Sequence, residues 1–214
     1  MPRGRFITLE GGEGAGKSTQ ARFLVSLLAR HGIEAIATRE VGGCPGAEDI
    51  RSLWLSKPQG FWDPLTEVML IMAARREHLM KKILPALEQG KWVVSDRFID
   101  STRAYQGIGL DLGLDKIDTL YREIAGDFWP DKTLLLDLPV ETGLARMTAR
   151  STETDRYEQQ DAVFHEKLRQ GFLSLARAEP SRLTVIDGSG EPQAVSVLLE
   201  KAIRPLIEAS SSHA

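Results

Sequence analysis

Cysteine is almost absent from this chain of 214 residues. Cys44 is the single one, so no disulfide can form within the chain, and we expect a reducing cytoplasm as its compartment. Histidine is scarce too, and one cysteine with four scattered histidines does not suit a zinc cluster or a cysteine–histidine catalytic pair. We interpret the histidines as surface residues: His31, His78, His165 and His213.

Long apolar runs are also absent. The first apolar run, residues 6–9, is shorter than the roughly 7–15 residues of a signal peptide core. No stretch approaches the roughly 20 apolar residues that cross a membrane. We therefore expect a cytoplasmic protein with no membrane partner.

The chain also lacks a large excess of positive or negative charge. The chain has 27 Lys and Arg against 30 Asp and Glu, a formal net charge of −3. The molecule as a whole has no positive field that would attract nucleic acid, so we expect no nucleic-acid partner. Phosphate binding must therefore come from locally placed arginines and lysines. The length and ordinary hydrophobic share suit one α/β domain, which we expect to span residues 1–214.

What the sequence does contain is a series of short apolar runs that alternate with helical patterns. This alternation predicts βα units on a parallel sheet. The expected strands are residues 6–9, 34–38, 92–95, 133–138 and 183–186. The expected helices are residues 17–31, 64–88, 115–125, 140–149, 161–178 and 192–208. We predict an α/β fold: a doubly wound, parallel five-stranded sheet flanked by helices, with its site at the carboxyl ends of the strands.

A glycine-rich loop follows the first strand and reads GGEGAGKS over residues 11–18. This is a full G-x-x-x-x-G-K-S phosphate loop between a strand and a helix. Its backbone N–H groups can turn inward around phosphates, Lys17 can reach the β- and γ-phosphates, and the Ser18 hydroxyl can bind Mg²⁺. The ATP-binding candidates are Gly11, Gly12, Glu13, Gly14, Ala15, Gly16, Lys17, Ser18 and Thr19.

The phosphate loop alone does not separate kinases from GTPases and motor ATPases. No Asn-Lys-x-Asp guanine-reading motif occurs in the sequence. Large ATPases need longer chains for their coupling apparatus. A small-molecule kinase therefore fits the size of the chain.

Charged residues end three of the predicted strands. Asp96 ends one apolar strand and Asp137 ends another, so the pattern alone leaves two candidates for a carboxylate that holds Mg²⁺ through water. Arg97 lies next to Asp96, and Arg39 ends the second strand. Arginines at strand ends around a phosphate loop suit phosphate oxygens, because their planar guanidinium groups donate two hydrogen bonds.

Four further segments resemble the thymidylate kinase family when they are read together with the loop. They are TREVGG at residues 38–43, AAR at 73–75, DRFIDSTRAYQG at 96–107 and DRYE at 155–158. Their order and spacing cover about residues 5–190, and the third segment is the most specific. The resemblance implies a P-loop kinase fold and transfer of a phosphoryl group from ATP to dTMP, which yields dTDP for dTTP synthesis and DNA replication. It also implies Mg²⁺ as cofactor, nucleotides as small-molecule partners and a homodimer.

The resemblance also assigns roles at the acceptor site. It favours Asp96 over Asp137 at the metal, and it implies that Arg39 grips the 5′-phosphate while Glu13 contacts the sugar. Arg97 would reach the phosphates in transfer. The candidate dTMP-binding residues are Glu13, Arg39, Ile71, Arg75, Arg97, Ser101, Thr102, Tyr105 and Gln106.

Arg75 matches the family residue that hydrogen-bonds the thymine edge. Arg76 is the alternative, and because adjacent helical positions point about 100° apart, both cannot serve the base.

A mobile lid is expected at about residues 146–160, where Arg146, Arg150 and Arg156 recur. Family members with Glu-Gly in the loop supply a catalytic arginine from the lid, so the resemblance assigns this role to Arg150, with Arg156 as the alternative. The catalytic candidates are thus Lys17, Arg97 and Arg150.

Two residues depart from the family pattern. Val41 stands where the family usually has proline, and Ile71 stands where it usually has the phenylalanine that stacks on thymine. Two other functions remain open at this point: a kinase for another nucleoside monophosphate, and a P-loop binding protein without catalytic activity. We expect three of the four tryptophans to pack the core: Trp54, Trp92 and Trp129.

Overall fold

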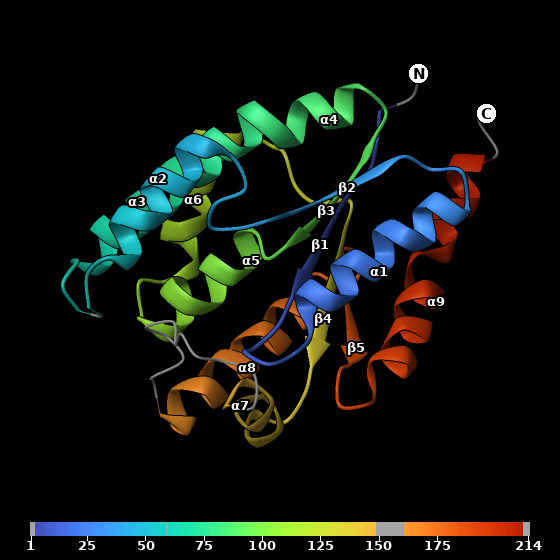
Figure 1. Cartoon of the computed structure of the whole chain (residues 1–214). Helices are drawn as coiled ribbons and strands as arrows, with labels where there is room; N and C mark the ends of the chain where they lie inside the picture. The colour runs from blue at the N-terminus through green and yellow to red at the C-terminus, as the bar shows by residue number, and fades with distance from the viewer. Residues whose placement is uncertain (1–2, 59, 149–160, 212–214) are drawn as a thin grey trace.

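The computed structural model describes residues 3–58, 60–148 and 161–211. Its centre is a five-stranded parallel sheet with the order β2-β3-β1-β4-β5 (Figure 1). The strands are β1 (Phe6–Glu10), β2 (Ala35–Arg39), β3 (Trp92–Asp96), β4 (Lys132–Asp137) and β5 (Leu183–Asp187). Both ends of every strand lie within one residue of the prediction, and the predicted fold class is confirmed.

Two helices, α1 (Lys17–Arg30) and α9 (Pro192–Ser211), lie side by side on one face of the sheet (Figure 1). Side chains alternate between the two faces of a strand, so Ile7 of β1 points to this side. Ile7 packs in one buried cluster with Leu28 of α1 and Leu199 of α9. This apolar layer fixes the start of α1, and with it the phosphate loop.

The remaining helices cover the other face and its edge (Figure 1). Phe6 and Val93 point to this side and pack with Phe98 and Tyr121 in a second buried cluster. The helices are α2 (Pro45–Leu55), α3 (Pro64–His78), α4 (Leu84–Glu88), α5 (Ile99–Thr102), α6 (Leu114–Ala125), α7 (Val140–Thr148) and α8 (Ala162–Ala178).

The helix predicted for residues 64–88 is confirmed in its bounds, but it is not α-helical throughout. The structure divides it into α3, a π-helical turn over Leu79–Ile83 and α4. Pro85 lacks an N–H group and its ring crowds the carbonyl four residues earlier, so an ordinary α-helical turn cannot pass through it. The chain widens instead, and the Leu84 N–H donates to the carbonyl of Leu79, five residues back.

Three helical segments were not predicted: α2, α5 and the π-helical segment Arg103–Gly109. For α2 the signals were present, because Pro45 occupies the first helical turn and Glu48 adds an acidic side chain there. The other two begin within the DRFIDSTRAYQG segment, and each is too short to show a helical period.

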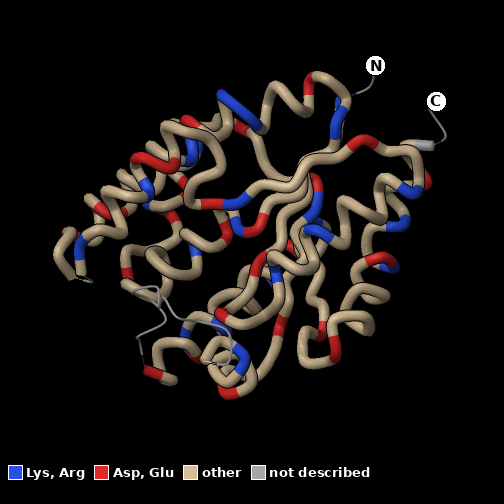
Figure 2. The backbone as a smooth tube through the Cα atoms, viewed as in Figure 1, with Lys and Arg blue, Asp and Glu red and all other residues tan. Residues whose placement is uncertain are grey.

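Charges of both signs are interspersed along the backbone (Figure 2). Several pair across elements, as Arg5 does with Asp131 and Lys91 with Glu34. In the part of the chain that the structure describes, no helix is long and apolar enough to span a bilayer.

Candidate functional site

The carboxyl ends of β1, β2 and β3 open into a cavity of about 370 Å³. Most of the predicted site residues line it: Glu13, Gly14, Ala15, Gly16, Lys17, Ser18, Thr19, Arg39, Ile71, Arg75, Asp96, Arg97, Ser101, Thr102, Tyr105 and Gln106. Gly11 and Gly12 lie instead beside a smaller cavity of about 30 Å³ behind the phosphate loop.

The phosphate loop needs glycine at two positions for different reasons. Gly16 precedes α1 in the left-handed conformation, with φ of 86°. Gly14 has φ of 68°, and a Cβ atom there would lie 2.1 Å from the Gly143 carbonyl oxygen. Lys17 points back into the loop, where its Nζ donates to the carbonyl oxygens of Gly11 at 3.1 Å and Gly12 at 2.7 Å.

The ammonium group of Lys17 is buried, and this burial together with the nearby charge of Arg97 lowers its pKa. Favourable charges from Glu13 and Asp96 act in the opposite direction. Water screens charges only weakly at a buried site. An anionic phosphate is therefore strongly attracted to the buried cation and to the inward-facing backbone N–H groups beside it.

Ser18 and Asp96 meet at the start of α1, where the Ser18 hydroxyl donates to Asp96 Oδ2 at 2.5 Å. Among the described residues, no group of three or more His, Cys, Asp or Glu side chains could hold a metal ion. Mg²⁺ fits two oxygen ligands nonetheless, because it keeps several waters and takes further oxygens from phosphates. The donor chemistry of this pair therefore suits Mg²⁺.

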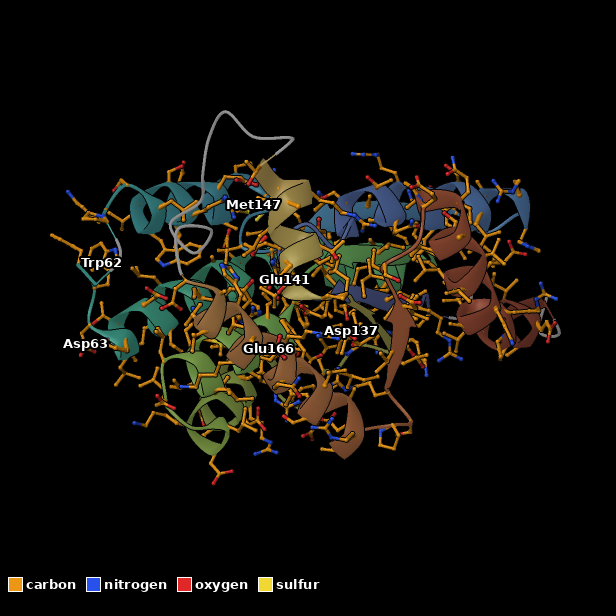
Figure 3. All side chains as sticks on the ribbon, turned by 90° about the horizontal axis from the view of Figure 1, so that it is seen from below. Trp62, Asp63, Asp137, Glu141, Met147 and Glu166 are labelled. Atoms are coloured by element: carbon orange, nitrogen blue, oxygen red, sulfur yellow. The ribbon has the colours of Figure 1, made fainter. Side chains whose placement is uncertain are left out.

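The other carboxylate candidate, Asp137, has a different environment (Figure 3). It accepts from Arg169 Nε at 2.7 Å and Nη2 at 3.0 Å, in a two-pronged ion pair. It lines the smaller cavity with Arg169. The structure thus places Asp96, and not Asp137, against the hydroxyl of the phosphate loop.

Arg97 connects the loop with the segment after β3. Its Nη2 donates to Glu13 Oε1 at 2.6 Å and to the Tyr105 hydroxyl at 3.1 Å. Its Nη1 donates to Gly11 O at 3.1 Å and to Ser101 Oγ at 3.0 Å. Burial acts to raise the pKa of Glu13, but the charges of Arg97 and Lys17 and the hydrogen bond from Tyr105 together outweigh it and lower that pKa to about 2. The carboxylate is therefore ionised beside the cavity at neutral pH.

Arg39 extends from the end of β2, and 57% of its side chain is exposed. It pairs with Glu48 of α2 at 2.9 Å, and Glu48 also accepts from the Gly43 N–H at 2.8 Å. Arg51, also on α2, lines the same cavity and donates to Val41 O at 2.8 Å. The sequence interpretation missed Arg51 because it did not predict α2.

Arg75 is 2% exposed and lines the same cavity as Lys17. Its Nε donates to Glu40 Oε2 at 2.7 Å, and its Nη2 donates to Thr102 Oγ1 at 3.0 Å. Arg76 points elsewhere, because its Nη1 donates to Ile124 O at 2.7 Å. Of the two neighbours, the structure places Arg75 at the cavity.

The wall beside Arg75 is largely apolar. Ile71 is 3% exposed and packs in one cluster with Trp54 and Tyr105. Trp54 packs the core as predicted, and it also lines the cavity. On the same wall, Gln106 Nε2 donates to the buried carboxylate of Glu67 at 2.9 Å.

Two histidines contradict the surface interpretation. His78 and His165 are 0% and 6% exposed. His78 follows Ile71 and Arg75 at spacings of seven and three residues, so these three residues share one face of α3. That spacing was the signal that placed His78 with the site residues.

The start of the expected lid is described and the rest is not. Arg146 of α7 donates to the carbonyl oxygens of Gly188 at 2.9 Å and Ser189 at 2.8 Å. Met147, on the same helix, lines the large cavity (Figure 3). Arg150 and Arg156 lie outside the described residues.

Comparisons with known proteins show the family to which the chain belongs. A model of the thymidylate kinase family matches residues 9–198. A thymidylate kinase of Bradyrhizobium sp. (strain ORS 278) is 48% identical over 204 residues, which cover 94% of this chain and 90% of that protein. One from Alkalilimnicola ehrlichii is 49% identical over 203 residues, 95% of this chain and 94% of that protein. The crystal structure of thymidylate kinase from Ehrlichia chaffeensis matches with a TM-score of 0.75 at 36% identity, over 94% of this chain and 99% of that one. The chain belongs to the thymidylate kinase family.

Proposed function

We propose that this protein transfers the γ-phosphoryl group of ATP to dTMP, giving ADP and dTDP for the synthesis of dTTP. One observation supports it most: a single cavity joins a phosphate loop to a buried arginine that can read a base. Lys17, Arg97 and Arg75 all line this cavity. Such a cavity suits two nucleotides that meet through their phosphates.

The donor end would hold ATP through the backbone of residues 11–19 and the ammonium group of Lys17. Ser18 and Asp96 would hold Mg²⁺, which supplies charge neutralisation of the phosphates when it is bound. The remaining coordination positions would be filled by water and phosphate oxygens.

The acceptor end would bind the phosphate, the sugar and the base of dTMP through different residues. Arg39 can pair with the 5′-phosphate, and the ionised Glu13 can accept a hydrogen bond from the sugar hydroxyl. Arg75 can donate to a carbonyl oxygen of thymine, because it is a buried donor at the cavity wall. Ile71 would cover one face of the base, and the polar side chains of Ser101, Thr102, Tyr105 and Gln106 would enclose the rest.

Catalysis in this proposal rests on positioning and charge. The two phosphates repel each other, so the protein must hold them in line and neutralise their charge. Lys17 and Arg97 can stabilise charge on the transferred group from two sides. Arg150 would add a third cation from the lid, and closure of that lid would exclude water.

We further propose that the protein is a cytoplasmic homodimer. The support is the family membership and a set of exposed apolar side chains on α2 and α3: Leu53, Leu65 and Met69. Sedimentation velocity at several concentrations tests the dimer, and cell fractionation tests the location. A monomer at all concentrations would contradict the first.

The test of the activity is release of ADP with a panel of acceptors: dTMP, dUMP, dCMP, dGMP and AMP. We expect dTMP to give the fastest release. Lys17→Ala provides the control, and we expect it to lower kcat by at least 10²- to 10³-fold, since a cation that stabilises the transition state is lost. Faster release with another acceptor would reassign the substrate, and ATP binding without any acceptor-dependent release would indicate a binding protein.

A further inference from the structure

His78 is the last residue of α3, and its side chain is fully buried. Both nitrogens of its ring have partners. Nδ1 lies 3.0 Å from Glu40 Oε1, and Nε2 lies 2.7 Å from the Thr38 hydroxyl. Glu40 lines the large cavity and His78 does not, so His78 can affect a ligand only through its neighbours, and Glu40 is its hydrogen-bond partner at the cavity.

Glu40 bridges His78 and Arg75 with its two carboxylate oxygens. Oε1 faces His78, and Oε2 accepts from Arg75 Nε at 2.7 Å. The exposed fractions of the Glu40 and Arg75 side chains are 2% and 1%. A carboxylate can only accept, so Nδ1 of His78 must carry the hydrogen. Two donors on opposite oxygens fix the plane of the Glu40 carboxylate, and that plane fixes the guanidinium of Arg75.

The loop after β2 packs directly against the His78 ring. A Cβ atom on Gly43 would lie 2.4 Å from His78 Nε2 and 2.7 Å from Thr38 Oγ1. The N–H of Gly43 donates to Glu48, which in turn pairs with Arg39. His78 therefore lies between the two arginines that face the acceptor end of the cavity.

We propose that His78 is a positioning residue that acts through Glu40 to aim Arg75 at the base of the acceptor nucleotide. The inference rests on the proposed function, since it assumes that dTMP occupies this end of the cavity. Affinity for the acceptor then depends on the donor at Nδ1. Affinity for ATP does not, because the phosphate loop makes none of these contacts.

Two substitutions separate the two contacts of His78. His78→Asn places an amide near the position of Nδ1 and can still donate to Glu40, whereas His78→Gln reaches toward Nε2 and Thr38. Each variant loses one hydrogen bond, so a purely structural role would affect both alike. We expect His78→Gln to raise the KM for dTMP about tenfold, equivalent to about 1.4 kcal/mol, with the KM for ATP unchanged. We expect His78→Asn to stay near the wild type.

Thr38→Val is the matched control, because it removes the same contact as His78→Asn and should also leave the KM for dTMP near the wild-type value. Melting temperatures of all variants show whether each is folded. Four outcomes would each overturn the proposal. The KM for dTMP could rise equally in the two His78 variants, rise in neither of them, or rise as much in Thr38→Val as in His78→Gln. The KM for ATP could also rise as much as the KM for dTMP.

If His78→Gln does not fold, Glu40→Gln tests the same link. It keeps the shape of the side chain and weakens the bridge between His78 and Arg75. We expect a higher KM for dTMP and an unchanged KM for ATP; a folded variant with an unchanged KM for dTMP would contradict the proposal. A wild-type protein without dTMP-dependent ADP release would refute the proposed function itself, whatever the variants show.

Discussion

Single side chains decide which nucleotide can occupy the acceptor end of the cavity. Arg75 and Arg76 are neighbours in the chain, yet Arg75 is buried at the cavity while Arg76 binds the Ile124 carbonyl at the surface. The difference follows from the 100° rotation between adjacent helical residues. Sequence alone could state that only one of the two serves the base, and the packing of α3 shows which one faces the cavity.

Arg75 and Arg76 give a prediction in which a substitution at Arg76 is the control. Arg75→Lys keeps the positive charge beside Glu40 but loses the planar group that donates in two directions. We expect it to raise the KM for dTMP at least tenfold, or about 1.4 kcal/mol, while Arg76→Lys leaves it unchanged. Steady-state kinetics with saturating ATP measure both. Equal effects of the two substitutions would show that Arg75 does not contact the base.

Ile71 gives a second prediction at this scale. An isoleucine excludes water from the base but lacks the aromatic face that makes stacking worth roughly 1–3 kcal/mol per base. We expect Ile71→Phe to tighten dTMP binding by a few-fold to tenfold, with kcat little changed. The gain is limited because Ile71 packs against Trp54 and Tyr105, and overpacking costs about 1–3 kcal/mol. Calorimetric titration with dTMP measures it. An unchanged affinity in an equally stable variant would mean that Ile71 does not face the base.

At the scale of elements, the end of β1 supports the segment that carries Arg97. Glu10 is fully buried there, and its carboxylate accepts from the Phe98 N–H at 2.7 Å and from the Ser101 hydroxyl at 2.6 Å. Burial, with the charge of Asp100 in second place, raises the pKa of Glu10 to about 8. The junction between two strands of the site is therefore held by a carboxyl group that titrates near neutral pH.

This raised pKa predicts a pH dependence of stability. Between about pH 4.5 and 8 the folded state keeps the proton on Glu10 that the unfolded state loses, so the free energy of unfolding falls as pH rises through this range. Glu10→Gln resembles the protonated acid in shape and does not titrate. We expect the difference in unfolding free energy, variant minus wild type, to increase by at least about 1 kcal/mol from pH 5.5 to pH 8.5.

Urea denaturation of both proteins across this range measures that difference. A difference that stays constant with pH would show that Glu10 has an ordinary pKa in the folded protein.

At the scale of the whole molecule, a buried ionic network joins segments that are distant in the sequence. Arg182, which precedes β5, forms a two-pronged ion pair with the fully buried Asp100 of α5, at 2.6 and 2.8 Å. Arg103 lies 3.2 Å from Asp100 and 2.5 Å from Glu179, which follows α8. Both arginines also lie over the ring of Trp129, at 5.4 Å for Arg103 and 5.1 Å for Arg182. The network thus ties the segment after β3 to the connection between α8 and the edge strand β5.

We expect Asp100→Asn to be strongly destabilising, because it leaves two arginines without their shared buried counter-charge. Breaking a buried ion pair from one side costs about 3–5 kcal/mol. In a chain of this length each kcal/mol lowers Tm by roughly 2–4 °C, so we expect a fall of about 10 °C. Differential scanning calorimetry measures this fall in Tm.

The control is Lys167→Gln, which breaks the exposed pair with Asp111 and should leave Tm unchanged. Similar changes in both variants would contradict the role of the network.

The sequence by itself determined the sheet, the phosphate loop and the family, because these depend on local order. Short continuous apolar runs placed the strands, and the GGEGAGKS segment after β1 is contiguous, so no long-range contact is needed to recognise it. Ser18 was identified as a metal candidate from the phosphate-loop motif. Asp96 was one of two candidates from its position at a strand end, and the family resemblance favoured it over Asp137.

Only the tertiary structure decided which of several equivalent residues face the cavity. Asp96 differs from Asp137, and Arg75 from Arg76, through neighbours that come from distant parts of the chain: Ser18, Arg169, Glu40 and Ile124. The buried position of His78 likewise depends on the tertiary structure, because its partners Thr38 and Glu40 lie about 40 residues away in the sequence. Burial and pairing arise where α2 and α3 fold over the end of β2, and a local sequence pattern contains no record of that contact.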